Sequence, residues 1–176
     1  PLTGFCDDDI KLYGTLASKA ENNDPIDMAI ISKVKDSEEL AKQIEDYEQT
    51  DFKPFDPVSK RTEGEVKTKS GTFKGTKGAP QVILALAENR DKIKDEITKI
   101  VDEAGKRGFR TIGVGKTNSD GKWEYVGLID LEDPPRDDSG ETIKMARELG
   151  VEVKMITGDH GAIAKETCKQ VGIGTN

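Results

Sequence analysis

The sequence has one histidine, two cysteines and few aromatic residues, which make up 5% of its 176 positions. With His160 as the only histidine, no Ser/His/Asp set and no metal-ligand cluster can be assembled from the sequence. Cys6 and Cys168 lie far apart and are expected to be reduced, small apolar residues rather than a disulfide. No run approaches the ~20 apolar residues of a membrane-spanning helix, and the opening residues do not predict a signal peptide.

Positively charged residues are also outnumbered: the sequence has 27 Lys and Arg and 34 Asp and Glu, which gives a net charge of −7. This balance argues against nucleic acid or an anionic membrane surface as the main partner. It leaves room for a small anion such as ATP, because a local cluster of cations can still bind one. The scarcity of aromatic residues predicts an aliphatic core. The first residues, "PLTGFCDDD", lack Met, which we interpret as a sign of an excised fragment, although processing would give the same start.

The first 132 residues have the pattern of an α+β domain, in which a mostly antiparallel sheet is flanked by helices. Helices are expected over 7–20, from 25 onwards, over 36–47 and over 80–108, the last in one piece or two. Extended segments are expected over 51–64, in a hairpin around Ser70-Gly71, and over 109–117 and 122–131. Asp24 is expected to cap the second helix, with Pro25 in the first helical position.

The segment "EDPPRDD" then interrupts the pattern, because two prolines fit neither a strand ladder nor a helix interior. Beyond it the sequence predicts a helix over 139–149, a strand over 151–156, a turn, and a helix over 162–171. This order is typical of a parallel α/β sheet. One such unit is not a stable domain by itself, so it requires a sheet that the chain does not contain. We therefore predict an α/β protein with domains at 1–132 and 133–176.

The "TGD" turn is the first candidate site. Thr157 could donate its hydroxyl to a phosphoryl oxygen, Gly158 allows close approach of the backbone, and Asp159 could cap the helix or lie near a metal. As a tripeptide it is equally compatible with an ordinary α/β turn. His160 reads more simply as a residue of the first helical turn than as a base or ligand.

Three further segments could bind a nucleotide. In "FKPFDPVSKRT" the ring of Phe55 could stack on a base while Lys60 and Arg61 bind the phosphates. The alternative is that Phe52 and Phe55 are simply core residues. In "KGTKGAP" an ammonium at Lys77 could face phosphate, although the spacing is not that of a Walker loop and a solvated Gly-Lys turn is the simpler reading. Arg110, at the start of a strand, could be a further phosphate contact or a solvated strand end.

The order of these segments is more specific than any one of them. "ENNDPIDMAI", "FKPFDPVSKRT", "KGAPQVIL", "GFRTIGV", "WEYVGLIDLEDPPRDDS" and "VKMITGDHGAIAKET…GIGTN" follow one another along nearly the whole chain. Together they closely resemble the large cytoplasmic loop of P-type ATPases. "FDPVSKRT" and "ENNDPID" are most similar to the proton-pumping type of plasma membranes.

The resemblance implies that residues 1–132 are the nucleotide-binding (N) domain. It implies that 133–176 are the hinge and part of the phosphorylation (P) domain, which belongs to the haloacid dehalogenase-like superfamily. By the same resemblance, Phe55 stacks on adenine, Lys60 contacts the nucleotide, and Lys77 with the adjoining Gly78 lines the adenine pocket. Arg110 contacts phosphates, and Asp27 lies near the adenine amino group.

The resemblance further implies that Asp133 and Arg136 belong to the hinge between the N and P domains, and that Thr157, Gly158 and Asp159 form a phosphate-binding motif of the P domain. The family's phosphorylated aspartate, in D-K-T-G-T, and its Mg²⁺-binding G-D-G-x-N-D motif are absent from this sequence. The fragment alone is therefore expected to bind ATP or ADP without turnover, with most Mg²⁺ ligands outside the chain.

The expected partners are the remainder of the same pump: the rest of the P domain, the actuator domain and the transmembrane helices. The parent would be a multi-pass protein of the plasma membrane, and this region would be a soluble portion that faces the cytoplasm. Two other hypotheses are a stand-alone ATP-sensing module that regulates a partner and a small phosphatase of the dehalogenase type, for which Asp130 or Asp133 would have to be the nucleophile. A third alternative, inside the family, is a pump for a different cation.

Overall fold

The computed structural model describes all of the 176 residues except 3, 159–160 and 175–176. They form two compact units. The first consists of Pro1–Asp95 and Ile112–Ile129, and the second of Glu96–Thr111 and Asp130–Asn176. The division that the sequence predicts, at residue 132, concerns the domains of the related family and stays a prediction.

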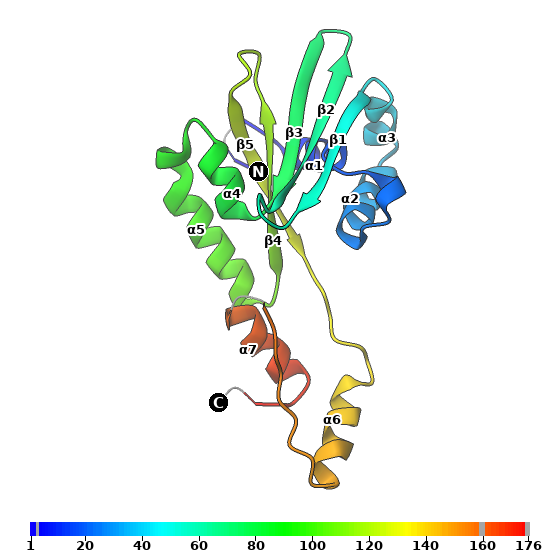
Figure 1. Ribbon diagram of the computed structural model, residues 1–176, viewed down its shortest axis with the longest axis vertical. Coiled ribbons are helices and arrows are strands. Elements are labelled where there is room, and N and C mark those ends of the chain that lie inside the picture. The colour runs from blue at the N-terminus through cyan, green and yellow to red at the C-terminus, as the bar shows by residue number, and fades with distance from the viewer. Residues whose placement is uncertain (3, 159–160, 175–176) are drawn as a thin grey trace. The chain divides into compact units, whose positions relative to one another are not determined.

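The first unit is built on a sheet with the strand order β1-β2-β3-β4-β5 (Figure 1). The strands are β1 (Glu48–Asp56), β2 (Arg61–Thr68), β3 (Gly71–Gly78), β4 (Arg110–Thr117) and β5 (Trp123–Leu131). Strands β1 to β4 pair antiparallel in chain order. The β2–β3 ladder is unbroken from Arg61↔Gly78 to Thr68↔Gly71, whereas the β1–β2 ladder has irregularities, one of them between Lys53 and Asp56. The predicted antiparallel sheet and the α/β class are confirmed.

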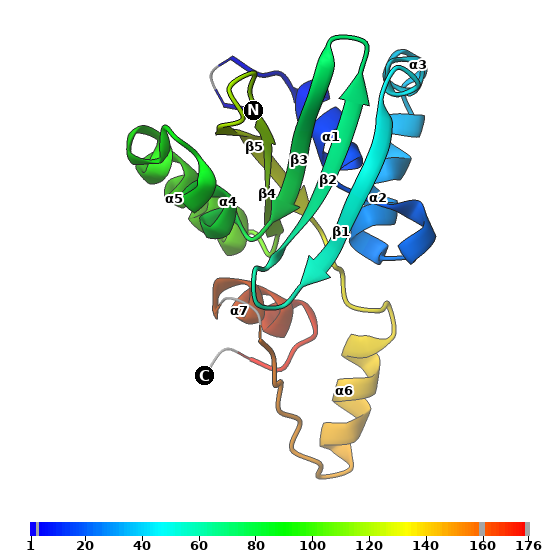
Figure 2. The same cartoon turned by 45° about the horizontal axis from the view of Figure 1, so that its top comes forward.

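Helices cover both faces of this sheet, as Figure 2 shows. On one face, α1 (Asp7–Leu16) contributes Leu12 and Leu16 to a core cluster with Val66 of β2. The same helix packs Ile10 against Val114 of β4. Successive strand residues point to opposite faces. Gly113, next to Val114, accordingly faces α4 (Pro80–Leu86) on the other side of the sheet. Because Gly113 has no side chain, Ile83 of α4 can pack close to the strand.

The remaining helices before β4 follow local signals in the sequence. Helix α2 (Pro25–Lys35) starts at Asp24, whose carboxylate accepts hydrogen bonds from the backbone N–H groups of Ile26 and Asp27, as the sequence predicts. A short 3-10 turn, η1 (Ala20–Asn22), precedes it, and α3 (Glu38–Ile44) follows. The predicted helical stretch over 80–108 forms two helices, α4 and α5 (Arg90–Lys106), because Ala87 has extended backbone angles.

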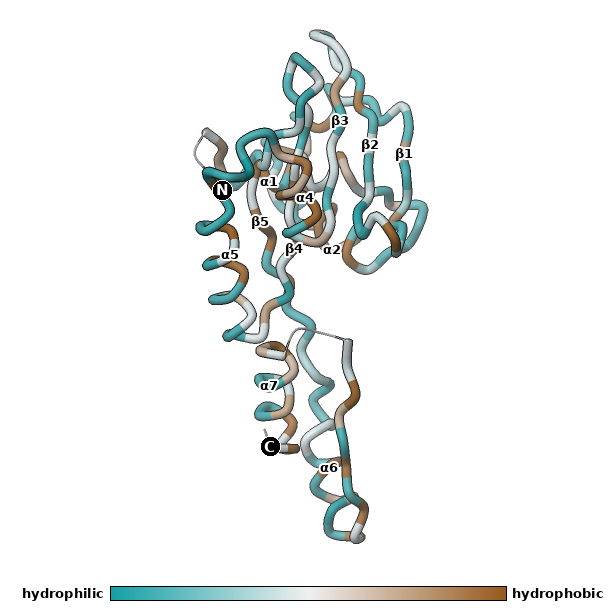
Figure 3. Tube along the Cα trace, turned by 60° about the vertical axis from the view of Figure 1, so that its left-hand side comes forward, coloured by the Kyte–Doolittle hydropathy of each residue, from teal (hydrophilic) through white to brown (hydrophobic). Residues whose placement is uncertain are grey.

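The second unit contains α6 (Ser139–Glu148) and α7 (Gly161–Gln170), close to the predicted helices. The predicted strand over 151–156 is wrong: this stretch is irregular, and Ile156 is 97% exposed. In Figure 3 the tube that leads from α6 to α7 shows hydrophobic positions of this stretch in brown. A strand forms only through hydrogen bonds to a neighbouring strand. Among the described residues of this unit, residues 151–156 have no strand beside them with which to pair. Among the described residues, no helix combines the length and apolar character that crossing a bilayer requires.

Candidate functional site

A buried ion pair joins two residues that lie 50 positions apart in the sequence. The Lys77 ammonium on β3 lies 2.5 Å from Oδ1 of Asp27, in the first turn of α2. Both side chains are only 4% exposed. Charges removed from water in this way require a partner, and each residue supplies it to the other.

Neighbouring groups fix the orientation of this pair. The second carboxylate oxygen of Asp27 accepts a hydrogen bond of 2.9 Å from the backbone N–H of Lys19. On the other side, the Thr62 hydroxyl of β2 donates to the Ala17 carbonyl at 2.6 Å and lies 3.4 Å from the Lys77 ammonium. The pair therefore connects the segment after α1, the start of α2 and two strands. The alternative reading of "KGTKGAP" as a solvated turn is wrong, because Lys77 is buried within a strand.

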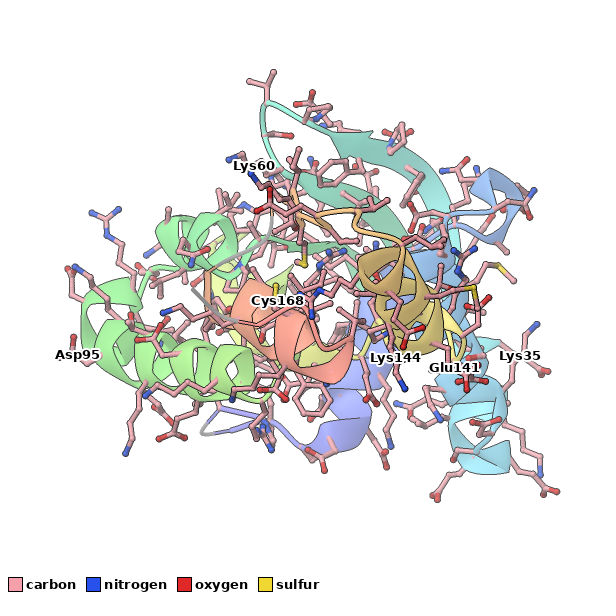
Figure 4. All side chains as sticks on the ribbon, turned by 90° about the horizontal axis from the view of Figure 1, so that it is seen from below. Lys35, Lys60, Asp95, Glu141, Lys144 and Cys168 are labelled. Carbon is pink, nitrogen blue, oxygen red and sulfur yellow. The ribbon has the colours of Figure 1, made fainter. Side chains whose placement is uncertain are left out.

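The end of β1 and the loop that follows it carry the predicted stacking residue and a predicted cation. Phe55, near the end of β1, is 57% exposed, so the alternative reading of Phe55 as a core residue is wrong. Lys60, labelled in Figure 4, is exposed and has a φ of 53°. An exposed ring followed five positions later by an exposed ammonium is a suitable arrangement for a base and its phosphates.

Gly78 connects this loop to the strand that carries Lys77. A Cβ atom at Gly78 would lie 2.3 Å from the Lys60 carbonyl oxygen and 2.7 Å from Cα of Arg61, so glycine is required for this approach. The next backbone N–H, of Ala79, donates to the same Lys60 carbonyl at 3.1 Å. The backbone of Lys60 therefore lies against Gly78, the residue that follows Lys77. Their roles in nucleotide binding stay predictions.

A cluster of charges on β1 to β3 was not predicted. The Glu63 carboxylate accepts hydrogen bonds from Arg61 at 2.7 Å, Lys53 at 3.1 Å and Lys74 at 3.2 Å. Burial alone would raise the pKa of Glu63, but these three cations outweigh it and lower the pKa to about 2. Because the Arg61 guanidinium binds Glu63, it is a weaker candidate for a phosphate contact than the exposed Lys60.

This Glu63 cluster is separate from the Asp27–Lys77 pair. Glu63 pairs with Thr76 in the ladder, and the neighbouring Thr62 pairs with Lys77. Alternate strand positions point to opposite faces, so the two charged groups lie on opposite sides of the sheet. No single run of sequence signals the cluster, because its members are brought together by strand register.

The other predicted site residues belong to the second unit. Arg110 begins β4, and its side chain is exposed. Asp133 and Arg136 lie in the exposed stretch between β5 and α6, where Arg136 is 3.9 Å from Asp138. Thr157 and Gly158 are exposed, and Asp159 lies outside the described residues. Outside the gaps at 3, 159–160 and 175–176, no three His, Cys, Asp or Glu side chains are grouped to hold a metal ion.

Comparisons with known proteins identify the class. Residues 12–175 match the model of the haloacid dehalogenase-like hydrolases, and the chain belongs to this family. Among individual proteins, it is 45% identical over 173 residues to a Methanocaldococcus jannaschii protein assigned as a cation-transporting ATPase, covering 98% of this chain and 21% of the relative. It is 46% identical over 136 residues to a Leishmania donovani protein assigned as a proton ATPase, covering 76% of this chain and 14% of the relative.

A third relative is plasma membrane ATPase 1 of Saccharomyces cerevisiae, which is 39% identical over 182 residues, covering 99% of this chain and 20% of the relative. The resemblance to a P-type ATPase loop that the sequence predicted is confirmed by these relatives. The chain spans between 14% and 21% of the length of the three relatives.

Proposed function

We propose that the chain is the nucleotide-binding portion, with the hinge and part of the phosphorylation domain, of a P-type ATPase that exports H⁺. The names of two relatives support a proton or plasma-membrane pump. The parent protein would couple ATP hydrolysis to cation transport across the plasma membrane, and this region would face the cytoplasm. The rest of the pump would be its partner.

In this proposal, ATP binds with its adenine against Phe55. The observation that carries it is the exposure of this ring, 57%, near the end of β1, followed in the next loop by the exposed Lys60. The Asp27–Lys77 pair lines the pocket, with the carboxylate near the adenine amino group. Gly78 supports the approach of the loop, and Arg110 contacts the phosphates.

The chemical step would take place in the parent protein. The N domain would move on the hinge at Asp133 and Arg136 and bring the γ-phosphate to an aspartate outside this sequence. In-line transfer would form an aspartyl-phosphate and release ADP. Thr157, Gly158 and Asp159 would bind the transferred phosphoryl group. Mg²⁺ would neutralise phosphate charge in such a reaction, while the described residues contain no group of three His, Cys, Asp or Glu side chains that could hold it.

Calorimetric titration with ATP and ADP tests the binding role. We expect saturable binding that weakens about tenfold in Phe55→Ala, because a stacked base contributes roughly 1–3 kcal/mol. Val58→Ala is the matched control, since Val58 is an 89% exposed apolar residue three positions after Phe55. Equal affinity of the wild type and Phe55→Ala would contradict the stacking role.

A pump for a different cation is the second candidate. The Methanocaldococcus jannaschii relative is named for cation transport without naming the proton. The ion-binding residues of such pumps would lie in membrane segments outside this chain. Transport by the parent protein in vesicles, measured with a pH-sensitive dye and with metal cations in turn, would distinguish the two.

A further inference from the structure

One residue binds every backbone N–H group in the loop between β1 and β2. The Asp56 carboxylate accepts from Val58 N at 3.2 Å and from Ser59 N at 2.8 Å, and the Asp56 carbonyl accepts from Lys60 N at 2.7 Å. Pro57, between them, has no N–H group. The hydrogen bonds from Ser59, followed by that from Val58, lower the pKa of the Asp56 carboxyl. Asp56 therefore determines the conformation of the whole loop.

The backbone of Lys60 has an unfavourable conformation at the end of this loop. Lys60 and Asn23 are the two non-glycine residues with positive φ in the part of the chain that the structure describes. Asn tolerates the left-handed region because its short side chain can hydrogen-bond locally, whereas Lys lacks this compensation. Such a conformation persists only when the surroundings impose it, and it is found preferentially at functional sites.

The surroundings of Lys60 hold it from two sides. The Asp56 backbone carbonyl accepts from its N–H group at 2.7 Å, while the Asp56 carboxylate holds the two preceding N–H groups, and Ala79 N–H donates to the Lys60 carbonyl at 3.1 Å. Gly78 allows this contact, since a Cβ there would lie 2.3 Å from the Lys60 carbonyl oxygen. The peptide groups on both sides of Lys60 are thus fixed, and its exposed side chain leaves the backbone in one direction.

We propose that Asp56 is a positioning residue that holds Lys60 in its left-handed conformation and thereby directs the ammonium towards the phosphates of a nucleotide stacked on Phe55. This inference rests on the proposed function. Fixing the loop before binding reduces the entropy lost when the nucleotide is captured. Asp56 itself acts through Lys60 and touches no ligand.

A double-mutant cycle on the 176-residue chain, with ATP binding as the readout, tests this role. We expect Lys60→Ala to weaken binding about tenfold, through loss of a charge-assisted phosphate contact, and Asp56→Ala to weaken it about fivefold. In the Lys60→Ala background, Asp56→Ala should have little further effect. Asp56→Asn keeps one acceptor oxygen and should bind with intermediate affinity.

The control is Asp36→Ala, which removes an exposed carboxylate paired only with Lys33 among the contacts described and should bind like the wild type. Circular dichroism tests whether each variant is folded. If Asp56→Ala is unfolded, the Asp56→Asn cycle gives the same comparison.

Three outcomes would overturn the inference. In the first, Asp56 variants retain full affinity while Lys60→Ala loses it, and the proposed function stands.

In the second, Asp56→Ala keeps its full effect in the Lys60→Ala background, so it acts by another route. In the third, Lys60→Ala binds normally while Phe55→Ala does not, so adenine stacking stands without a lysine to position. If the proposed function itself is wrong, the result is different: the wild-type chain then binds neither ATP nor ADP.

Discussion

At the scale of single residues, the Asp27–Lys77 pair makes each partner dependent on the other. Lys77→Met would leave the Asp27 carboxylate 4% exposed with only the Lys19 N–H group as a partner. We expect a loss of about 3–5 kcal/mol in the free energy of unfolding, the cost of an uncompensated buried charge. Asp27→Leu combined with Lys77→Met should recover most of this loss. Urea denaturation measures both, and a loss below about 1 kcal/mol for Lys77→Met would contradict it.

Glu63 provides a prediction about pH. Its pKa is lowered from 4.5 to about 2 in the folded chain, so the folded state favours the ionised form. The stability that results is fully present above pH 4.5 and is lost as the pH falls towards about 2. We expect Glu63→Gln to abolish about 2 kcal/mol of this pH dependence, allowing for solvent screening. The measurement is urea unfolding at a series of pH values.

The control for this experiment is Glu65→Gln, on the same strand face and opposite Lys74 in the ladder. It should leave the acid slope of the wild type nearly unchanged. An equal loss of slope in both variants would show that general charge, and not the Glu63 cluster, causes the pH dependence.

At the scale of helices and strands, local signals were enough for most of the first unit. The cap at Asp24, the turn at Ser70-Gly71 and the break near Ala87 depend on residues within a few positions of each other. The sequence predicted these features correctly, or left open only whether one helix or two would form. Where the structure depends on partners far along the chain, the sequence was less informative.

The stretch over 151–156 illustrates that limit. Its apolar residues have the composition of a buried strand, but composition does not supply a neighbouring strand, and Ile156 is 97% exposed. The candidate site shows the same difference. Phe55 and Lys60 are close in sequence and could be proposed from it. Asp27 and Lys77 were each proposed from family resemblance, and the ion pair between them was not predicted. The Glu63 cluster, which requires the register of three strands, was missed.

At the scale of the whole molecule, the central question is whether this chain can hydrolyse ATP by itself. It lacks the D-K-T-G-T and G-D-G-x-N-D motifs, and the described residues hold no grouped metal ligands. Asp130, which would serve a phosphatase instead, is already engaged by Thr111 at 3.2 Å and by Arg107 at 3.6 Å. Asp133 precedes two prolines, which do not suit a nucleophile loop.

We therefore expect the purified chain with ATP and Mg²⁺ to show saturable nucleotide binding and no steady release of phosphate above the buffer rate. Malachite-green assays over several hours, with Asp130→Asn and Asp133→Asn as paired variants, separate the possibilities. Release that either substitution abolishes would favour a dehalogenase-type phosphatase, because the nucleophile would then lie within this chain. Release that neither variant changes would point to a contaminant. Binding without release, as expected, would place the acceptor of the γ-phosphate in the parent protein.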